Sequence, residues 1–332
     1  MKSNDRSDKN RIAVYAGLTV ACLAVLTLIL FGIVRLMRSA KSDADDQRTR
    51  ELMESNEDHP IATIGHETIE ELEAGRTKDP ETTPEILPTE TPEPEMPVVT
   101  EKMAGIISAW NNEDIVGWLH IQNSQSDQNM NGISYAVTQT DKPGTGGEIG
   151  EYYLKRGLDG EYSDRGSLFL DYRANSGVGV RENGYWGGNA PSDILLIYGH
   201  NMGDESMFGT LKRYLNTEFA WNHRFIEYDS LYEHRIYQVI SVFRSNVMTS
   251  AEVMDYSDPK DPNFKYYQFT NYLTEGEFDY WYANVMSHSE VNLQKYESIE
   301  AHYGDEFLVL STCHGPINGT GLLCVVAVRV ER

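Results

Sequence analysis

Basic residues are scarce in this chain. Its 332 residues include 28 Lys and Arg against 51 Asp and Glu, which gives a formal net charge of -23. Binding of nucleic acid needs clustered Lys and Arg to neutralise the phosphates. The composition therefore excludes nucleic acid as a partner.

Cysteine is scarce as well. The three cysteines are too few and too scattered for a disulfide scaffold or a four-ligand zinc site. No cluster of His, Cys and carboxylates has metal-site spacing, and the glycine-rich stretch 142–150 (KPGTGGEIG) lacks the Lys-Ser or Lys-Thr pair of a phosphate loop. We expect no metal and no cofactor, so any cysteine that matters acts singly.

Residues 12–34 contain no charged side chain and are long enough, as a helix, to cross a hydrocarbon core of about 30 Å. The run exceeds the apolar core of a cleaved signal peptide, about 7–15 residues, which is the alternative interpretation. Because more basic charge precedes than follows it, we expect a cytoplasmic tail at 1–11 and a single-pass membrane protein. The C-terminal bulk would then be extracellular.

Residues 35–100 are rich in Glu, Asp, Thr and Pro; within them, 43–100 hold 17 acidic residues and four basic ones. Such a segment has too few large apolar residues to offset the entropy of ordering, and its like charges repel. We expect a disordered acidic linker over 35–100.

Residues 101–332 have the length and pattern of one globular domain. Helical spacing opens it and recurs at 205–215 and 277–289. Between these lie runs rich in β-branched and aromatic residues, bounded by turn residues: 167–173, 193–200, 235–245, 306–313 and 322–330. Strands outnumber helices and lack regular βαβ alternation, which predicts a mostly antiparallel barrel or sandwich with a few helices.

Two of these runs end in residues that can do chemistry. The run 193–200 delivers His200 at its exit, and the run 306–313 delivers Cys313. A free thiol is mostly protonated at neutral pH, so a nucleophilic cysteine needs an adjacent base or cation. Cys313 and His200 form the minimum set for acyl transfer through a thioester; a buried structural cysteine and a loop histidine are the alternative.

A third group should stabilise the oxyanion of the tetrahedral intermediate. In the closing run 322–330 the only candidate cation is Arg329, although Arg residues on terminal strands usually face solvent.

Motifs across residues 112–332 resemble those of the class B sortases, the membrane-anchored cysteine transpeptidases of Gram-positive bacteria. The resemblance rests on segments in the expected order: DIVGWL (114–119), YYL (152–154), GSLFLDYR (166–173), IYGHNM (197–202) with MFG (207–209), and LSTC (310–313). It implies an eight-stranded β-barrel with Cys313 as the nucleophile that forms a thioacyl intermediate. It also implies His200 as its acid–base partner and Ser311 and Thr312 in the substrate-binding site.

One departure from the family pattern concerns the catalytic Arg, which usually stands at the start of the last strand. Leu322 holds that place here, and Arg329 lies seven positions later, an odd separation that in a regular strand puts it on the opposite face. A bulge could bring Arg329 into the site, or Arg173, Arg181 or Arg244 could substitute, or activity could be reduced.

Two neighbours of the nucleophile also bear on the site. His314 directly follows it and is expected to be a solvated loop residue, with tuning of the thiol as the alternative. Cys324 lies in an apolar run, and we expect a buried free thiol rather than a disulfide with Cys313.

The resemblance implies a transpeptidase that cleaves a C-terminal sorting signal, of a type similar to Asn-Pro-x-Thr, in secreted proteins. It then transfers them to an amine of peptidoglycan or its lipid-linked precursor, or to a pilin subunit. The alternatives are a Cys–His surface peptidase that only hydrolyses, and a degenerate, non-catalytic binding module, which the Leu in place of the family's Arg at position 322 suggests.

Overall fold

A computed structural model describes residues 4–55, 98–122, 132–177, 191–247, 251–272, 274–297, 299, 301–313 and 321–330. The chain divides into two compact units, residues 1–48 and residues 49–332.

The first unit belongs to one long helix, α1 (Asn4–Ser55), which contains the predicted membrane span at 12–34. Within the described part of the chain, no helix has the length and apolarity needed to cross a membrane. The linker predicted for 35–100 is wrong over 35–55, where α1 continues. This stretch has no Pro or Gly and is rich in Arg, Lys, Met, Leu and Glu, which favour helix. Residues 56–97 of the predicted linker lie outside the described residues.

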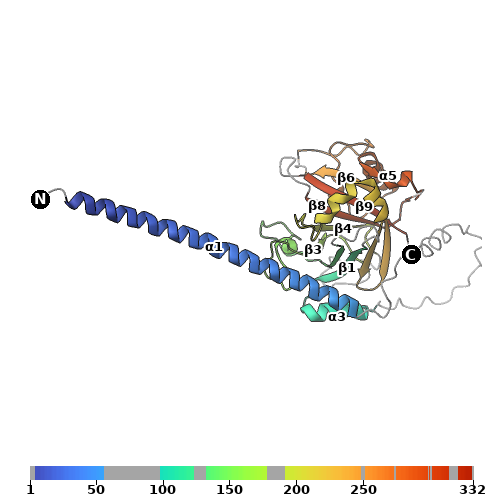
Figure 1. Cartoon of the computed structure of the whole chain (residues 1–332). Coiled ribbons are helices and arrows are strands. Elements are labelled where there is room, and N and C mark those ends of the chain that lie inside the picture. Colours follow the sequence, from blue (N-terminus) through green and yellow to red (C-terminus); the bar gives the residue numbers. More distant parts are fainter. Residues whose placement is uncertain are drawn as a thin grey trace, which may run out of the picture. The chain divides into compact units, whose positions relative to one another are not determined.

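A barrel forms the centre of the second unit (Figure 1). Its strands follow one another around the sheet in the order β5-β1-β2-β3-β4-β8-β9-β6, and pairing of β5 with β6 closes the ring. The predicted eight-stranded barrel is therefore confirmed, and a two-residue strand, β7, pairs with β6 outside the ring. The strands are β1 (Ile115–Ile121), β2 (Ile133–Thr138), β3 (Leu168–Leu170), β4 (Ile194–Gly199), β5 (Phe225–Ser230), β6 (His234–Asn246), β7 (Val291–Asn292), β8 (Phe307–Cys313) and β9 (Gly321–Arg329).

Most neighbouring strands are antiparallel, as predicted. The exceptions among the described strands are β2 with β3 and β4 with β8, which run parallel. Antiparallel partners place successive strand ends at opposite edges, whereas parallel partners place both carboxyl ends at one edge. The β4–β8 pair therefore decides where the residues after these two strands meet.

Both faces of the β4–β8–β9 wall are buried, which explains why these strands are apolar throughout rather than alternating. On β9, Leu323, Val325 and Ala327 belong to the core inside the barrel. Cys324 and Val326 belong instead to an outer core, which also contains residues of α5 (Glu275–Ser287). Alternate residues of one strand thus face two different cores.

Helices are few and mostly short. α3 (Glu101–Trp110) begins where the Thr100 hydroxyl accepts a hydrogen bond from the Met103 amide and ends at Asn111, whose φ is 47°. α5 confirms the helix predicted at 277–289, whereas the helix predicted at 205–215 is a 3-10 helix, η2 (Gly209–Leu215). It starts late because Glu205 and Met207 adopt positive φ angles, which an α-helix excludes. The remaining short helices are η1 (Tyr152–Lys155), α4 (Thr217–Asn222), η3 (Tyr266–Gln268) and η4 (Leu293–Lys295).

Gly199, the last residue of β4, is tightly enclosed. A Cβ added there would lie 2.4 Å from Leu168 Cδ2 and 2.7 Å from Phe208 Cδ2. The barrel and the turn after β4 therefore approach each other at a position where no larger residue fits.

We expect Gly199→Ala to lower the free energy of unfolding by about 1–3 kcal/mol, because overpacking forces neighbouring side chains off their preferred positions. Gly146→Ala is the matched control, since a Cβ at Gly146 meets no atom within 4 Å. Urea unfolding of both variants measures the difference, and equal midpoints would show that the contact at Gly199 is not restrictive.

Candidate active site

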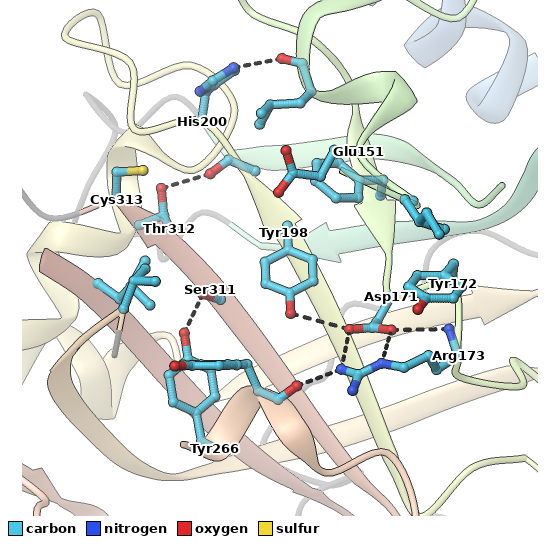
Figure 2. A pocket seen from close by; sticks show the side chains of 18 residues that line it. Glu151, Asp171, Tyr172, Arg173, Tyr198, His200, Tyr266, Ser311, Thr312 and Cys313 are labelled. Carbon is cyan, nitrogen blue, oxygen red and sulfur yellow. Dashed lines mark hydrogen bonds and ion pairs between the residues drawn. The ribbon is translucent and has the colours of Figure 1, made fainter. Parts of the chain in front are cut away.

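The parallel pairing of β4 and β8 brings His200 and Cys313 to the same edge of the barrel. Gly199 and Thr312 are register partners, so His200 and Cys313 come next on strands about 4.8 Å apart. Two further bonds join the strand ends: the Thr312 hydroxyl donates to the Gly199 carbonyl at 2.8 Å, and the Asn201 amide donates to the Cys313 carbonyl at 2.7 Å. The two residues predicted to be catalytic are thus brought together (Figure 2).

His200 is half-buried and oriented by the backbone of η1. Its Nε2 lies 2.6 Å from the Leu154 carbonyl oxygen, which can only accept, so Nε2 carries a proton. Burial lowers the pKa of His200, although the bond to Leu154 opposes this shift. A neutral ring with its proton on Nε2 leaves Nδ1 as the basic nitrogen.

The two cysteines of the barrel differ in their surroundings. Cys313 is a free thiol exposed at the end of β8, whereas Cys324 is a free thiol buried in β9. Burial raises the pKa of Cys324 to about 12, so this thiol stays protonated and unreactive. The expectation of a buried free Cys324 is confirmed, and the exposed thiol is the one beside the histidine.

A pocket of about 420 Å³ opens beside these residues, on the outer face of the barrel wall. Ser311 and Thr312, the predicted substrate-binding residues, line it together with His200 and Cys313. Both hydroxyls are engaged within the protein, Ser311 with the Tyr266 hydroxyl at 2.7 Å and Thr312 with Gly199. Their contact with a substrate stays a prediction. The remaining lining residues are Ile149, Gly150, Glu151, Leu154, Phe169, Asp171, Tyr172, Arg173, Tyr198, Gly199, Val247, Tyr266, Tyr267 and Leu322.

An ion pair lies at the end of the pocket away from Cys313 (Figure 2). Arg173 donates from Nε and Nη2 to the two carboxylate oxygens of Asp171 at 2.9 and 2.8 Å. Tyr198 donates to the same carboxylate at 3.2 Å. Among the described lining residues Arg173 has the only guanidinium group, and Asp171 offsets its charge. The sequence named Arg173 as a substitute cation, but missed its partners: Asp171, two residues before it after β3, and Tyr198, which the fold brings to them on β4.

The assignment of Arg329 to the site is wrong. No bulge interrupts the β8–β9 register, in which Cys313 pairs with Leu322. Arg329 is seven residues further along β9, roughly 23 Å at about 3.3 Å per residue, and on the opposite face. Its guanidinium forms ion pairs with Glu233 and Glu306 at 3.3 and 3.2 Å. Arg329 thus belongs to an ion-pair cluster at the far end of the barrel, which also holds the fully buried Arg235.

Leu322 occupies the position at which the class B sortase pattern usually has its catalytic arginine. It is the cross-strand partner of Cys313 and lines the pocket. Arg244 forms an exposed ion pair with Glu290 and is not among the lining residues. Arg181 and His314, the other residues considered from the sequence, lie outside the described residues.

Two curated relatives are similar to the chain, and no family model matches it. Sortase B of Staphylococcus aureus (strain NCTC 8325 / PS 47) is 26% identical over 219 residues, which cover 66% of this chain and 71% of the relative. Sortase B of Listeria monocytogenes serovar 1/2a (strain ATCC BAA-679 / EGD-e) is 30% identical over 153 residues, 45% of this chain and 52% of the relative. The chain thus spans about half the length of this second relative.

Solved structures share the barrel. A Staphylococcus aureus sortase B–substrate complex matches with a TM-score of 0.52 at 22% identity, covering 70% of this chain and 87% of the other. A sortase B complexed with triglycine matches with a TM-score of 0.50 at 22% identity, covering 69% and 86%. At these identities the likeness shows the fold.

The placement of Arg329 predicts a structural effect of its removal. We expect Arg329→Ala to lower the free energy of unfolding by about 1–3 kcal/mol, because two carboxylates at the end of the barrel lose a charged partner. Arg244→Ala, which removes an exposed pair, should change it by less than about 1 kcal/mol. Thermal unfolding compares the two variants, while the alkylation rate of Cys313 should stay at the wild-type value in both. A slower alkylation of Cys313 in Arg329→Ala would contradict this placement and show that Arg329 acts at the active site.

Proposed function

We propose that the chain is a class B sortase, a cysteine transpeptidase, in which Cys313 and His200 carry out acyl transfer from a sorting signal to an amine. Its similarity to two curated sortase B proteins supports this proposal. The observation that carries the proposal is the parallel β4–β8 register, which places an exposed thiol beside a neutral imidazole. The adjoining pocket offers space for a peptide.

In the first half-reaction, Nδ1 of His200 accepts the proton of the Cys313 thiol. The thiolate attacks the carbonyl carbon of the Thr in a sorting signal similar to Asn-Pro-x-Thr, and a tetrahedral oxyanion forms. When the peptide C–N bond breaks, the imidazolium returns its proton to the departing amine, and the acyl group stays on sulfur. The sortase B–substrate complex among the similar structures supports a peptide as the first substrate.

In the second half-reaction, a neutral amine attacks the thioester. The new C–N bond forms, the C–S bond breaks, and His200 passes the amine proton to the departing Cys313 thiolate. The complex of a similar sortase B with triglycine supports an amine acceptor. We assign this role to an amino group of peptidoglycan or its lipid-linked precursor, with a pilin subunit as the alternative.

The Leu at position 322 affects the expected rate of thioester formation, because its side chain cannot stabilise the oxyanion. In other enzymes, removal of one oxyanion donor costs about 3–4 kcal/mol of transition-state stabilisation. The cationic side chain of the pocket, Arg173, is bound to Asp171. A slow first step is the expected consequence, and this is the observation that keeps the non-catalytic binding module as a second candidate.

We expect a peptide with an Asn-Pro-x-Thr motif to form a thioester on Cys313 that mass spectrometry detects in the wild type. The adduct should be absent in Cys313→Ala and unchanged in Cys324→Ala, because the thiol of Cys324 is buried. His200→Ala should slow its formation by about 10²–10⁴-fold, the usual contribution of a general acid–base.

The acceptor separates the remaining candidates. Triglycine should convert the adduct into a peptide-bonded product, whereas release of the free acid at every triglycine concentration would identify a hydrolytic peptidase. Absence of an adduct with any sorting peptide from the same genome would identify a binding module.

We also place the enzyme at the cell membrane, with the catalytic unit extracellular. The uncharged run 12–34 supports this location. The full chain should sediment with membranes and resist alkaline extraction, while a chain without residues 1–34 should not. Recovery of the full chain in the supernatant would contradict the anchor.

A further inference from the structure

Glu151 is fixed in the wall of the pocket, close in sequence to the group that orients His200. It directly precedes η1, and its carbonyl accepts a hydrogen bond from the Leu154 amide at 3.1 Å. A Cβ at Gly144 would lie only 2.8 Å from the Glu151 Cβ, so the hairpin at 142–150 packs directly on this residue. The backbone of Glu151 is therefore held between the hairpin and η1.

The carboxylate of Glu151 has no ion-pair or hydrogen-bond partner among the described residues. Figure 2 shows it pointing into the pocket, toward the side on which Cys313 lies. The nearest basic residues in the sequence are engaged elsewhere: Lys142 with Asp114, Lys155 with the Asp164 carbonyl, and Arg156 with the Gly160 carbonyl. Burial, and then the charge of Glu148, raise the pKa of Glu151, as expected for a carboxylate without a counter-charge.

The charge of the pocket follows from this arrangement. Its charged lining residues are Glu151, Asp171 and Arg173, and the last two form a bidentate ion pair. One uncompensated negative charge therefore remains among the described lining residues, in a pocket whose lining also includes the apolar residues Ile149, Val247 and Leu322. Such a site attracts a cation.

The two substrates of a transpeptidase differ in charge. The Asn, Pro and Thr side chains of a sorting signal of the Asn-Pro-x-Thr type are uncharged, so none of these three can form an ion pair with Glu151. An amine acceptor is largely protonated at neutral pH, because an α-amino group has a pKa of about 7.7–8.0 and a lysine of about 10.4. The unpaired carboxylate thus complements the second substrate.

We propose that Glu151 binds the ammonium group of the amine acceptor. This inference rests on the proposed function and assigns to its second half-reaction a residue that the sequence did not single out. Glu151 concentrates and orients the acceptor in the pocket that holds the Cys313 thioester. The bound ammonium group then loses one proton to the solvent, and the neutral amine attacks the thioester as described above.

The full-length chain tests this with two nucleophiles. Triglycine carries an ammonium group, whereas hydroxylamine is uncharged above neutral pH. We expect Glu151→Gln to raise KM for triglycine by about tenfold, the loss of one charge-assisted contact. The rate of thioester formation with the sorting peptide and the KM for hydroxylamine should stay within about twofold of wild type.

Glu148→Gln is the matched control, since it removes the same charge from an exposed position of the same hairpin and should leave KM for triglycine within about twofold of wild type. Glu151→Asp should recover part of the loss. Should Glu151→Gln fail to fold by circular dichroism, the salt dependence in the wild type decides: KM for triglycine should rise with ionic strength and KM for hydroxylamine should not.

The outcomes distinguish a failure of the Glu151 assignment from a failure of the proposed function. Absence of a thioester in the wild type overturns the proposed function itself. A normal thioester with an unchanged KM for triglycine in Glu151→Gln overturns only the assignment of Glu151. A raised KM for the sorting peptide instead would place Glu151 in the first substrate's site and overturn it as well.

Discussion

The parallel pairing of β4 with β8 is the interaction on which the site depends. The sheet is mostly antiparallel, and an antiparallel partner would have put His200 and Cys313 at opposite edges of the barrel. The parallel register makes Gly199 and Thr312 neighbours, so His200 and Cys313, which directly follow them, also lie close together. The bonds from Thr312 and Asn201 then join the two strand ends.

The second constraint is that the β4–β8–β9 wall is covered on both faces. The inner face packs inside the barrel and the outer face packs against α5 and neighbouring aromatic residues. Side chains alternate between the two faces of a strand, so odd-numbered and even-numbered residues of β9 pack into different cores. Leu322 shares the face of the pocket, and Arg329 does not. The odd spacing in the sequence correctly indicated this, since no bulge interrupts the described β8–β9 pairing.

The pocket combines a reactive end with a polar end. At one end are the exposed thiol and the neutral imidazole; at the other, Arg173 and Asp171 neutralise each other. Glu151 lies in the wall with its charge unpaired by any described residue. A carboxylate left in this condition costs free energy unless a ligand supplies the opposite charge, which is why the second substrate is the natural partner to propose.

The sequence by itself determined the strands that carry the site, the two residues at their ends, and the resemblance of the motifs to those of class B sortases, because these depend on local patterns. The acidic composition was a poorer guide, since it predicted disorder over 35–55, where residues with high helix propensity extend α1. Only the tertiary structure decided which residues face the thiol. It put Leu322 opposite Cys313, sent Arg329 to the far end of the barrel, and brought Glu151 into the pocket. Such placements depend on the register of strands far apart in the chain, and a local pattern contains no information about that register.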